Sequence, residues 1–201
     1  MIKIGIIGEN YQNDACAFKA FLTPQYRSEI MFVPILKSLN GGTPPIDKVS
    51  RMLPTEIQKH ELNAILYIRD LDKDIERLDR NRWFTNMQKR TPVQSIFFLA
   101  VMELEALILA DVETFNLNFG IQQQYSKNPK FEVDPKAKLR FWTQKGKAKR
   151  QYDENCAEEI FSKLNFNTVY KKHSGNDSFQ AFIDVFETQF MLVIKFKYEV
   201  Y

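Results

Sequence analysis

The chain has 201 residues, which suits one domain, or one domain with a subdomain, and allows a sizeable buried core. Hydrophobic residues make up 44% and charged residues 26%, the balance of a globular protein and not of a low-complexity chain. The 28 basic and 25 acidic residues give a net charge of +3, which is too small to identify a class of partner.

The two cysteines and the lengths of the apolar runs indicate where in the cell the protein is expected. Cys16 and Cys156 form no CxxC motif or Cys/His cluster, so neither a zinc site nor a disulfide framework is expected. The apolar run at the amino terminus breaks at Gly8, too early for a signal peptide. The longest later apolar run, residues 96–102, is far below the ~20 residues that cross a bilayer. We therefore expect a cytoplasmic protein that makes no membrane contact.

Four short segments are continuously apolar and rich in β-branched or aromatic residues, the pattern of strands covered on both faces: 2–7, 30–35, 64–68 and 95–101. Segments of helical character lie between them, at 14–22, 46–61 and 73–89. Strands that alternate with helices predict right-handed connections. The expected fold is an α/β open parallel sheet with helices on both faces.

The chain changes character after the fourth strand. Residues 102–115 have apolar positions at helical spacing and predict a helix packed on the sheet. Residues 116–135 are polar and aperiodic, and the remainder reads mainly as helices, most clearly at 178–190. We expect an α/β core over residues 1–115 and a basic, mainly helical C-terminal region, 116–201, packed on the core.

Acidic residues follow three of the predicted strands. Glu9 comes after the first, Asp70 and Asp72 after the third, and Glu103 and Glu105 after the fourth. The carboxyl ends of parallel strands share one edge, where open α/β sheets bind ligands. Clustered carboxylates repel one another unless a cation neutralises them, and oxygen ligands suit Mg²⁺ or Mn²⁺. The alternative is that each acid caps a helix or complements its dipole.

Two of these motifs resemble a known family. GIIGEN, with Glu9, and YIRDLD, with Asp70 and Asp72, resemble the two metal-binding motifs of the Toprim domain, found in type IA and II topoisomerases, bacterial primases and OLD-family nucleases. FFLAVMELEALILAD is similar to uncharacterised Toprim-like proteins of phage-defence loci, often encoded beside ATPases, and Glu105 is the matching position. One residue departs from the pattern, because Arg69 stands where an apolar residue is expected.

The resemblance implies a Toprim-like, Rossmann-like fold. It also implies Mg²⁺ or Mn²⁺ held at a catalytic site by Glu9, Asp70, Asp72 and Glu105, with Glu103 in reserve. The chain is short for a topoisomerase or a primase, so the expected function is a nuclease acting on DNA or RNA by metal-dependent phosphodiester hydrolysis. A partner ATPase is implied by the same resemblance.

Two alternatives remain open. One is a non-catalytic Toprim-fold module with a regulatory or binding role. The other is a phospho-acceptor receiver domain, which is disfavoured because Asn10 follows Glu9 where a second acid is expected. Met102 and Glu103 also follow the fourth strand, where a receiver has a hydroxyl residue.

The stretch 135–152 carries seven basic residues and, up to Tyr152, no acid. Such a run either contacts a phosphate backbone or forms a solvated helix that Phe141 and Trp142 anchor to the core; we favour anchoring for the two aromatics. The candidate nucleic-acid-binding residues are Lys136, Lys138, Arg140, Lys145, Lys147, Lys149 and Arg150. His173 is expected at the surface or in a loop, and Tyr152 is expected to be structural.

Overall fold

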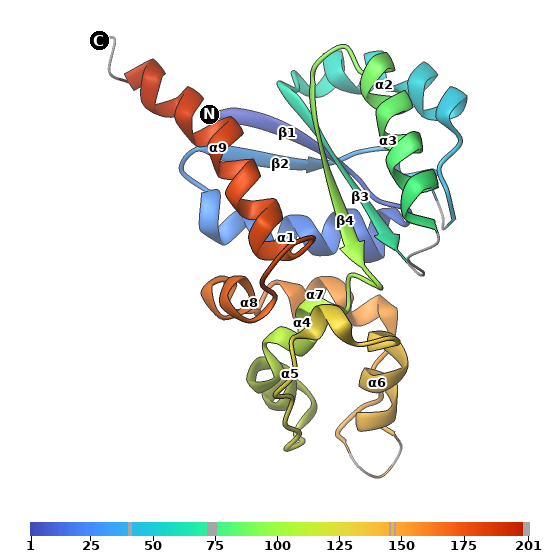
Figure 1. The fold of residues 1–201 in the computed structure, drawn as a ribbon, viewed down its shortest axis with the longest axis vertical. Coiled ribbons are helices and arrows are strands. Elements are labelled where there is room, and N and C mark those ends of the chain that lie inside the picture. The colour runs from blue at the N-terminus through green and yellow to red at the C-terminus, as the bar shows by residue number, and fades with distance from the viewer. Residues whose placement is uncertain (40–41, 72–75, 145, 147, 199–201) are drawn as a thin grey trace.

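The computed structural model describes residues 1–39, 42–71, 76–144, 146 and 148–198, with side chains as far as residue 190. Four strands form one parallel sheet in the order β2-β1-β3-β4. They are β1 (Ile2–Ile7), β2 (Ile30–Pro34), β3 (Ala64–Leu71) and β4 (Gln94–Val101) (Figure 1). The predicted open, parallel α/β sheet is confirmed.

Helices cover both faces of this sheet, as the continuously apolar strands predict. The helices α1 (Ala17–Tyr26) and α9 (Phe179–Tyr198) lie on one face, and α2 (Ile46–His60) and α3 (Arg77–Arg90) lie on the other (Figure 1). Alternate side chains of each strand enter two separate apolar clusters. Phe98 of β4 stacks on Phe18 on the first face, and Tyr67 of β3 meets Trp83 edge-on on the second.

The segment after β4 differs from the single helix that its apolar spacing predicts. It forms two short helices, α4 (Ala106–Ala110) and α5 (Val112–Phe119), with a non-helical backbone at Asp111. The Asp111 carboxylate accepts the amide N–H of Thr114, in the first turn of α5, and the amide N–H of Asn165. Asp111 thus ends one helix because its side chain caps the next and ties down a distant segment.

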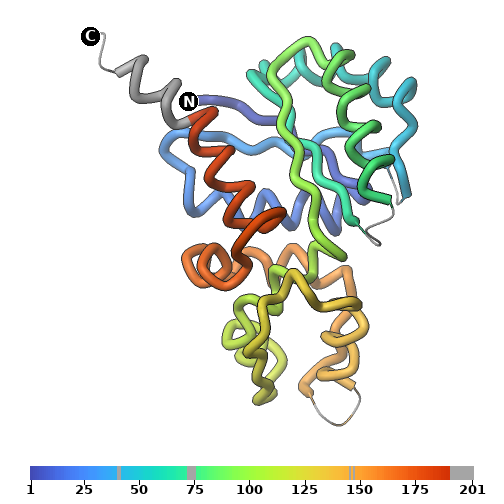
Figure 2. Tube along the Cα trace, viewed as in Figure 1, coloured from blue at the N-terminus to red at the C-terminus, as the bar shows by residue number. Residues whose placement is uncertain are grey.

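The C-terminal region lies beyond the carboxyl ends of the strands and then returns to the sheet (Figure 2). Its elements are a 3₁₀ turn (Pro129–Phe131), α6 (Pro135–Trp142), a second 3₁₀ turn (Glu154–Cys156), α7 (Ala157–Phe161), α8 (Phe166–Lys172) and α9. Phe182 of α9 packs against Phe98 of β4, and Leu139 of α6 belongs to the same buried cluster as the sheet. One continuous core therefore joins this region to the sheet.

His173 lies in the loop that follows α8, as expected, but it is buried there and not at the surface. Its side chain is only 2% exposed, and its Nδ1 accepts the amide N–H of Phe179 at 2.9 Å. Its backbone carbonyl accepts the amide N–H of Gln180. His173 therefore helps to cap the start of α9 together with Ser178, whose Oγ accepts the amide N–H of Ala181 at 3.1 Å. In the described part of the chain, no helix has the length and apolarity needed to cross a membrane.

Candidate functional site

The strand order places a change of direction between β1 and β3. The chain leaves β1 for β2 on one side and reaches β3 on the other, so a crevice is expected at the carboxyl ends of these two strands. Glu9 follows β1 there, and Asp70 is the penultimate residue of β3. A cavity of about 160 Å³ lies at this point. The described residues that line it include Glu9, Asp14, Asp70, Glu105, Lys136 and Glu154.

Asp70 is partly buried near the carboxyl end of β3. Its Oδ1 accepts the amide N–H of Leu104 at 3.0 Å, which fixes the carboxylate against the turn after β4. Burial raises the pKa of Asp70 well above its usual range, and the nearby carboxylates of Asp14, Glu105 and Glu9 raise it further. The protein thus holds Asp70 where its charge is unfavourable unless a cation approaches.

Asp14 is a member of the site that the sequence analysis missed. It lies in a π-helical turn, Tyr11–Cys16, and π-helical turns are frequent at functional sites. Its Oδ2 accepts the amide N–H of Asn10 at 2.7 Å, and burial raises the pKa of Asp14 to about 6. Gly8 permits this position, because a Cβ there would lie 2.4 Å from the Cβ of Asp14. The glycine directly before the predicted ligand Glu9 was the sequence signal that another residue approaches the backbone closely there.

Arg69 departs from the apolar pattern of a buried strand because its guanidinium pairs with Glu9. Its Nε lies 2.7 Å from Oε1 of Glu9, and its side chain is 2% exposed. Its guanidinium lies 4.8 Å from the ring centre of Trp83 and donates to the Thr43 hydroxyl. Arg80 also reaches Glu9, at 3.5 Å. Glu9 therefore enters the cavity already paired with arginine.

Glu105 lies on the other side of Asp70 and is paired with lysine. The Lys136 Nζ lies 3.7 Å from Glu105 Oε1, 3.6 Å from Glu103 Oε1 and 3.7 Å from Glu154 Oε1. Burial raises the pKa of Glu105 to about 7, although Lys136 opposes the shift. The Tyr152 hydroxyl donates to Glu105 Oε1 at 3.3 Å, so Tyr152 holds a site residue in place.

The described residues have the oxygen ligands and the space for a divalent cation, but not the spacing. Five carboxylates and one lysine ammonium line the cavity, counting the described residues only. Hard oxygen ligands are those of Mg²⁺ and Mn²⁺. A water molecule occupies ~30 Å³ of liquid, so the cavity has room for an ion and a few waters. In the described ranges, no three His, Cys, Asp or Glu side chains already lie close enough together to hold an ion. Binding would therefore draw the carboxylates inward.

Some predicted site residues fall elsewhere. Asp72, Lys145 and Lys147 lie outside the described residues. Most of the remaining basic candidates are paired with carboxylates: Lys138 with Glu132 at 2.7 Å, Arg140 with Glu154 at 2.7 Å, and Arg150 with Glu159 at 2.6 Å. Lys149 is exposed beside Gly120. The basic residues thus do not gather into one unpaired surface within the described part of the stretch.

The two aromatic residues of this stretch differ in exposure. Trp142 is partly buried and packs against Phe115 and Tyr125, as the anchoring interpretation predicts. Phe141 is 57% exposed, so anchoring to the core is wrong for this residue. The two neighbours on α6 point in different directions because successive residues of a helix face about 100° apart.

Comparison of the chain with protein-family models, with curated proteins and with solved structures finds no match. The resemblance to the Toprim domain therefore rests on the short motifs around Glu9, Asp70 and Glu105.

Proposed function

We propose that this chain is a divalent-metal-dependent phosphodiester hydrolase of Toprim type that acts on DNA or RNA. The observation that supports it is the convergence of Glu9, Asp70 and Glu105, from the ends of three strands, on one small cavity. Asp14 joins them, and Asp70 and Asp14 accept only backbone N–H groups among the hydrogen bonds of the described residues. Among the described residues, neither Asp70 nor Asp14 forms an ion pair with a basic side chain.

The proposed ligands of Mg²⁺ or Mn²⁺ are Asp70, Asp14, Glu105 and Glu9, together with Asp72 from the sequence motif. A bound ion would stabilise charge on the phosphate and lower the pKa of a water nucleophile. The chain's own residues prepare the ligands for this task. The Leu104 amide fixes Asp70, the Tyr152 hydroxyl holds Glu105, and Arg69 fixes Glu9.

Lys136 has a second part in this proposal. Its ammonium lies among Glu103, Glu105 and Glu154 at the cavity. Once an ion neutralises Glu105, the same ammonium would be available to a phosphate oxygen, which forms a strong charge-assisted hydrogen bond with lysine. The proposal also includes a partner ATPase and a cytoplasmic location, and only the sequence supports these two parts.

Nuclease assays test the proposal. End-labelled single- and double-stranded DNA and RNA are incubated with the protein in Mg²⁺, in Mn²⁺ or in chelator. We expect cleavage only with metal, and none with Asp70→Asn or Glu9→Gln. Asp79→Asn is the matched control, because the Asp79 side chain is 77% exposed on α3, outside the cavity. Cleavage that persists in both cavity variants would overturn the assignment.

A second candidate function is a non-catalytic module, and the position of Lys136 favours it. An ammonium held by three carboxylates can serve as a permanent internal cation in place of a metal. This candidate predicts no Mn²⁺ binding by the wild-type protein in isothermal titration calorimetry. It also predicts that Lys136→Met creates Mn²⁺ binding, whereas the hydrolase proposal predicts binding in both proteins.

A further inference from the structure

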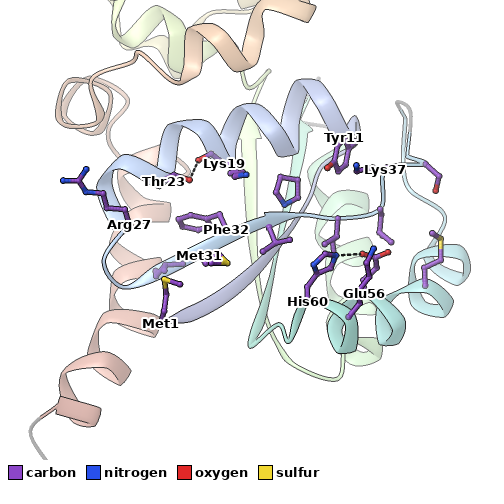
Figure 3. Close-up of a pocket in the computed structure, with 18 residues that line it drawn as sticks. Met1, Tyr11, Lys19, Thr23, Arg27, Met31, Phe32, Lys37, Glu56 and His60 are labelled. Carbon is purple, nitrogen blue, oxygen red and sulfur yellow. Dashed lines mark hydrogen bonds and ion pairs between the residues drawn. The ribbon is translucent and has the colours of Figure 1, made fainter.

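A groove between α1 and α2, beside the edge strand β2, carries four exposed cations (Figure 3). Its volume is about 1030 Å³, and its floor is formed by residues 30–38. The cations that line it are Lys19, Arg27, Lys37 and Lys59, and none of the four forms an ion pair with another described residue. In the basic stretch 135–152, by contrast, most of the described cations are already paired with carboxylates.

The cations lie on both walls of the groove. Lys19 and Arg27 lie eight residues apart on the α1 side, which is about 12 Å along a helix, and they share one helical face. Lys59, in the last turn of α2, lines the opposite wall. The acidic residue of the described lining, Glu56, lies 3.4 Å from His60. Positive charge therefore exceeds negative charge in this groove.

The floor of the groove offers side chains and not backbone groups. Ile30 and Phe32 are only 1% and 3% exposed, so the edge of β2 is closed to another strand. Met31, between them, is 42% exposed, and Tyr11 at the end of the groove is partly exposed. An occupant is therefore held by its charge and by contact with these two side chains.

One end of the groove lies beside the acidic cavity. Figure 3 shows Arg27 at one end of the groove and Tyr11 with Lys37 at the other. Tyr11 begins the π-helical turn, and its neighbour Asn10 lines the acidic cavity together with Asp14 of the same turn. The Lys37 ammonium lies 5.7 Å from the centre of the Tyr11 ring. A linear molecule in the groove would thus be directed past Tyr11 toward the carboxylates.

We propose that this groove binds a single-stranded nucleic acid and leads it to the acidic cavity. Its phosphates would contact Lys19 and Arg27, and its bases would stack on Tyr11 and contact Met31. The spacing of Lys19 and Arg27 matches about three or four stacked nucleotides at ~3.4 Å each. The delivery to the cavity rests on the proposed hydrolase function, whereas the binding does not.

Other occupants use less of this surface. A duplex keeps its bases stacked on one another, so Tyr11 and Met31 would gain no base as a partner. An acidic peptide would pair with the cations, but it has no base to stack on Tyr11, and the closed edge of β2 offers nothing to its backbone. A second copy of the chain would bring the same cations together, and like charges oppose such a contact.

Binding is tested in chelator, where metal-dependent cleavage cannot occur. Fluorescein-labelled oligo(dT) and oligo(U) of about 12 nucleotides are titrated with the full chain, and anisotropy is measured at several salt concentrations. The logarithm of the association constant should fall with the logarithm of salt concentration with a slope of about −2.8, because each of four cations contributes about −0.7. The two strands show whether DNA or RNA is preferred.

Charge variants provide a matched pair. Lys19→Gln with Arg27→Gln should weaken binding by about tenfold and reduce the slope to about −1.4, since two phosphate contacts are lost. Lys89→Gln with Lys171→Gln removes the same charge at exposed positions outside the groove and should change neither quantity. Ultraviolet cross-linking of an iodouracil-substituted strand should modify Tyr11 or Met31.

The groove proposal is overturned if neither strand binds, or if the two double variants bind equally. It is also overturned if a duplex of the same length or an oligoglutamate peptide binds more tightly than the single strand. Binding in the groove without cleavage in Mg²⁺ or Mn²⁺ would retain this proposal and remove the hydrolase function. Cleavage by the wild-type protein with unchanged binding by Lys19→Gln with Arg27→Gln would retain the hydrolase function and remove the groove.

Discussion

The guanidinium of Arg69 and the carboxylate of Glu9 lie 2.7 Å apart, between β1 and β3, where the strand order of the sheet changes direction. The arginine is almost completely buried, whereas the glutamate remains partly open to the cavity. One member of the pair thus belongs to the core and the other to the candidate site. The pair links the stability of β3 to the position of a proposed ligand.

Replacing Arg69 by Met should lower the free energy of unfolding by about 3 kcal/mol, because Glu9 loses the closer and more deeply buried of its arginine partners. The double variant Arg69→Met, Glu9→Gln should lose at least about 1 kcal/mol less than the sum of the single losses. Urea denaturation of the four proteins measures this coupling. Arg82→Met, at a side chain that is 74% exposed, is the control. Additive losses would show that the pair contributes no coupling.

Asp70→Asn should stabilise the metal-free protein at neutral pH, the opposite of most core substitutions. Burial and three neighbouring carboxylates raise the pKa of Asp70 in the folded chain. The folded state therefore holds a proton that the unfolded state has released, and stability falls as pH rises toward the folded pKa. The stabilisation by Asn should grow as pH increases from 4 to 8. Thermal unfolding in chelator checks this, and an unchanged or lower Tm at pH 8 would contradict it.

Mn²⁺ binding should weaken as pH falls from 8 to 6. Burial raises the pKa of Glu105 to about 7 and that of Asp14 to about 6, so both carboxyl groups take up protons across this range. A metal ligand must be ionised, and binding therefore releases protons. Calorimetric titrations at pH 7 in two buffers of different ionisation enthalpy measure the release. Equal heats in both buffers would indicate that no protonated carboxyl group joins the site.

The buried, neutral ring of His173 should make the stability of the fold fall in mild acid. Burial lowers the pKa of His173 to about 4, whereas the unfolded ring keeps its ordinary value of 6.5. Between these two values the unfolded state binds the extra proton, so stability is complete above pH 6.5 and is lost as pH falls toward 4. His173→Asn retains an oxygen that can accept the Phe179 amide and should show a smaller loss. NMR titration of the ring gives the pKa directly, and a value near 6.5 would contradict this assignment.

The strands and the meeting of Glu9, Asp70 and Glu105 could be predicted from the sequence. Continuous apolar runs indicate strands buried on both faces, and the carboxyl ends of parallel strands share one edge. These two rules suffice because they depend on local pattern and on sheet geometry, and both hold in the structure.

The residues that complete the cavity could not be predicted in this way. Asp14 lies in an irregular π-helical turn, which no hydrophobic period indicates. Lys136 and Tyr152 reach Glu105 from segments more than 30 residues away along the chain, and only the shared core brings them there. The sequence indicated the charge of Lys136 but not which carboxylates would surround it.

The position of Mn²⁺ in the crystallised protein tests the central claim most directly. Crystals soaked in Mn²⁺ would be measured at the manganese absorption edge, where anomalous scattering identifies the ion. The hydrolase proposal predicts an anomalous peak in the cavity among Asp70, Asp14 and Glu105, with Lys136 moved away from Glu105. A fully ordered cavity that shows no peak, with Lys136 still between Glu105 and Glu154, would contradict it.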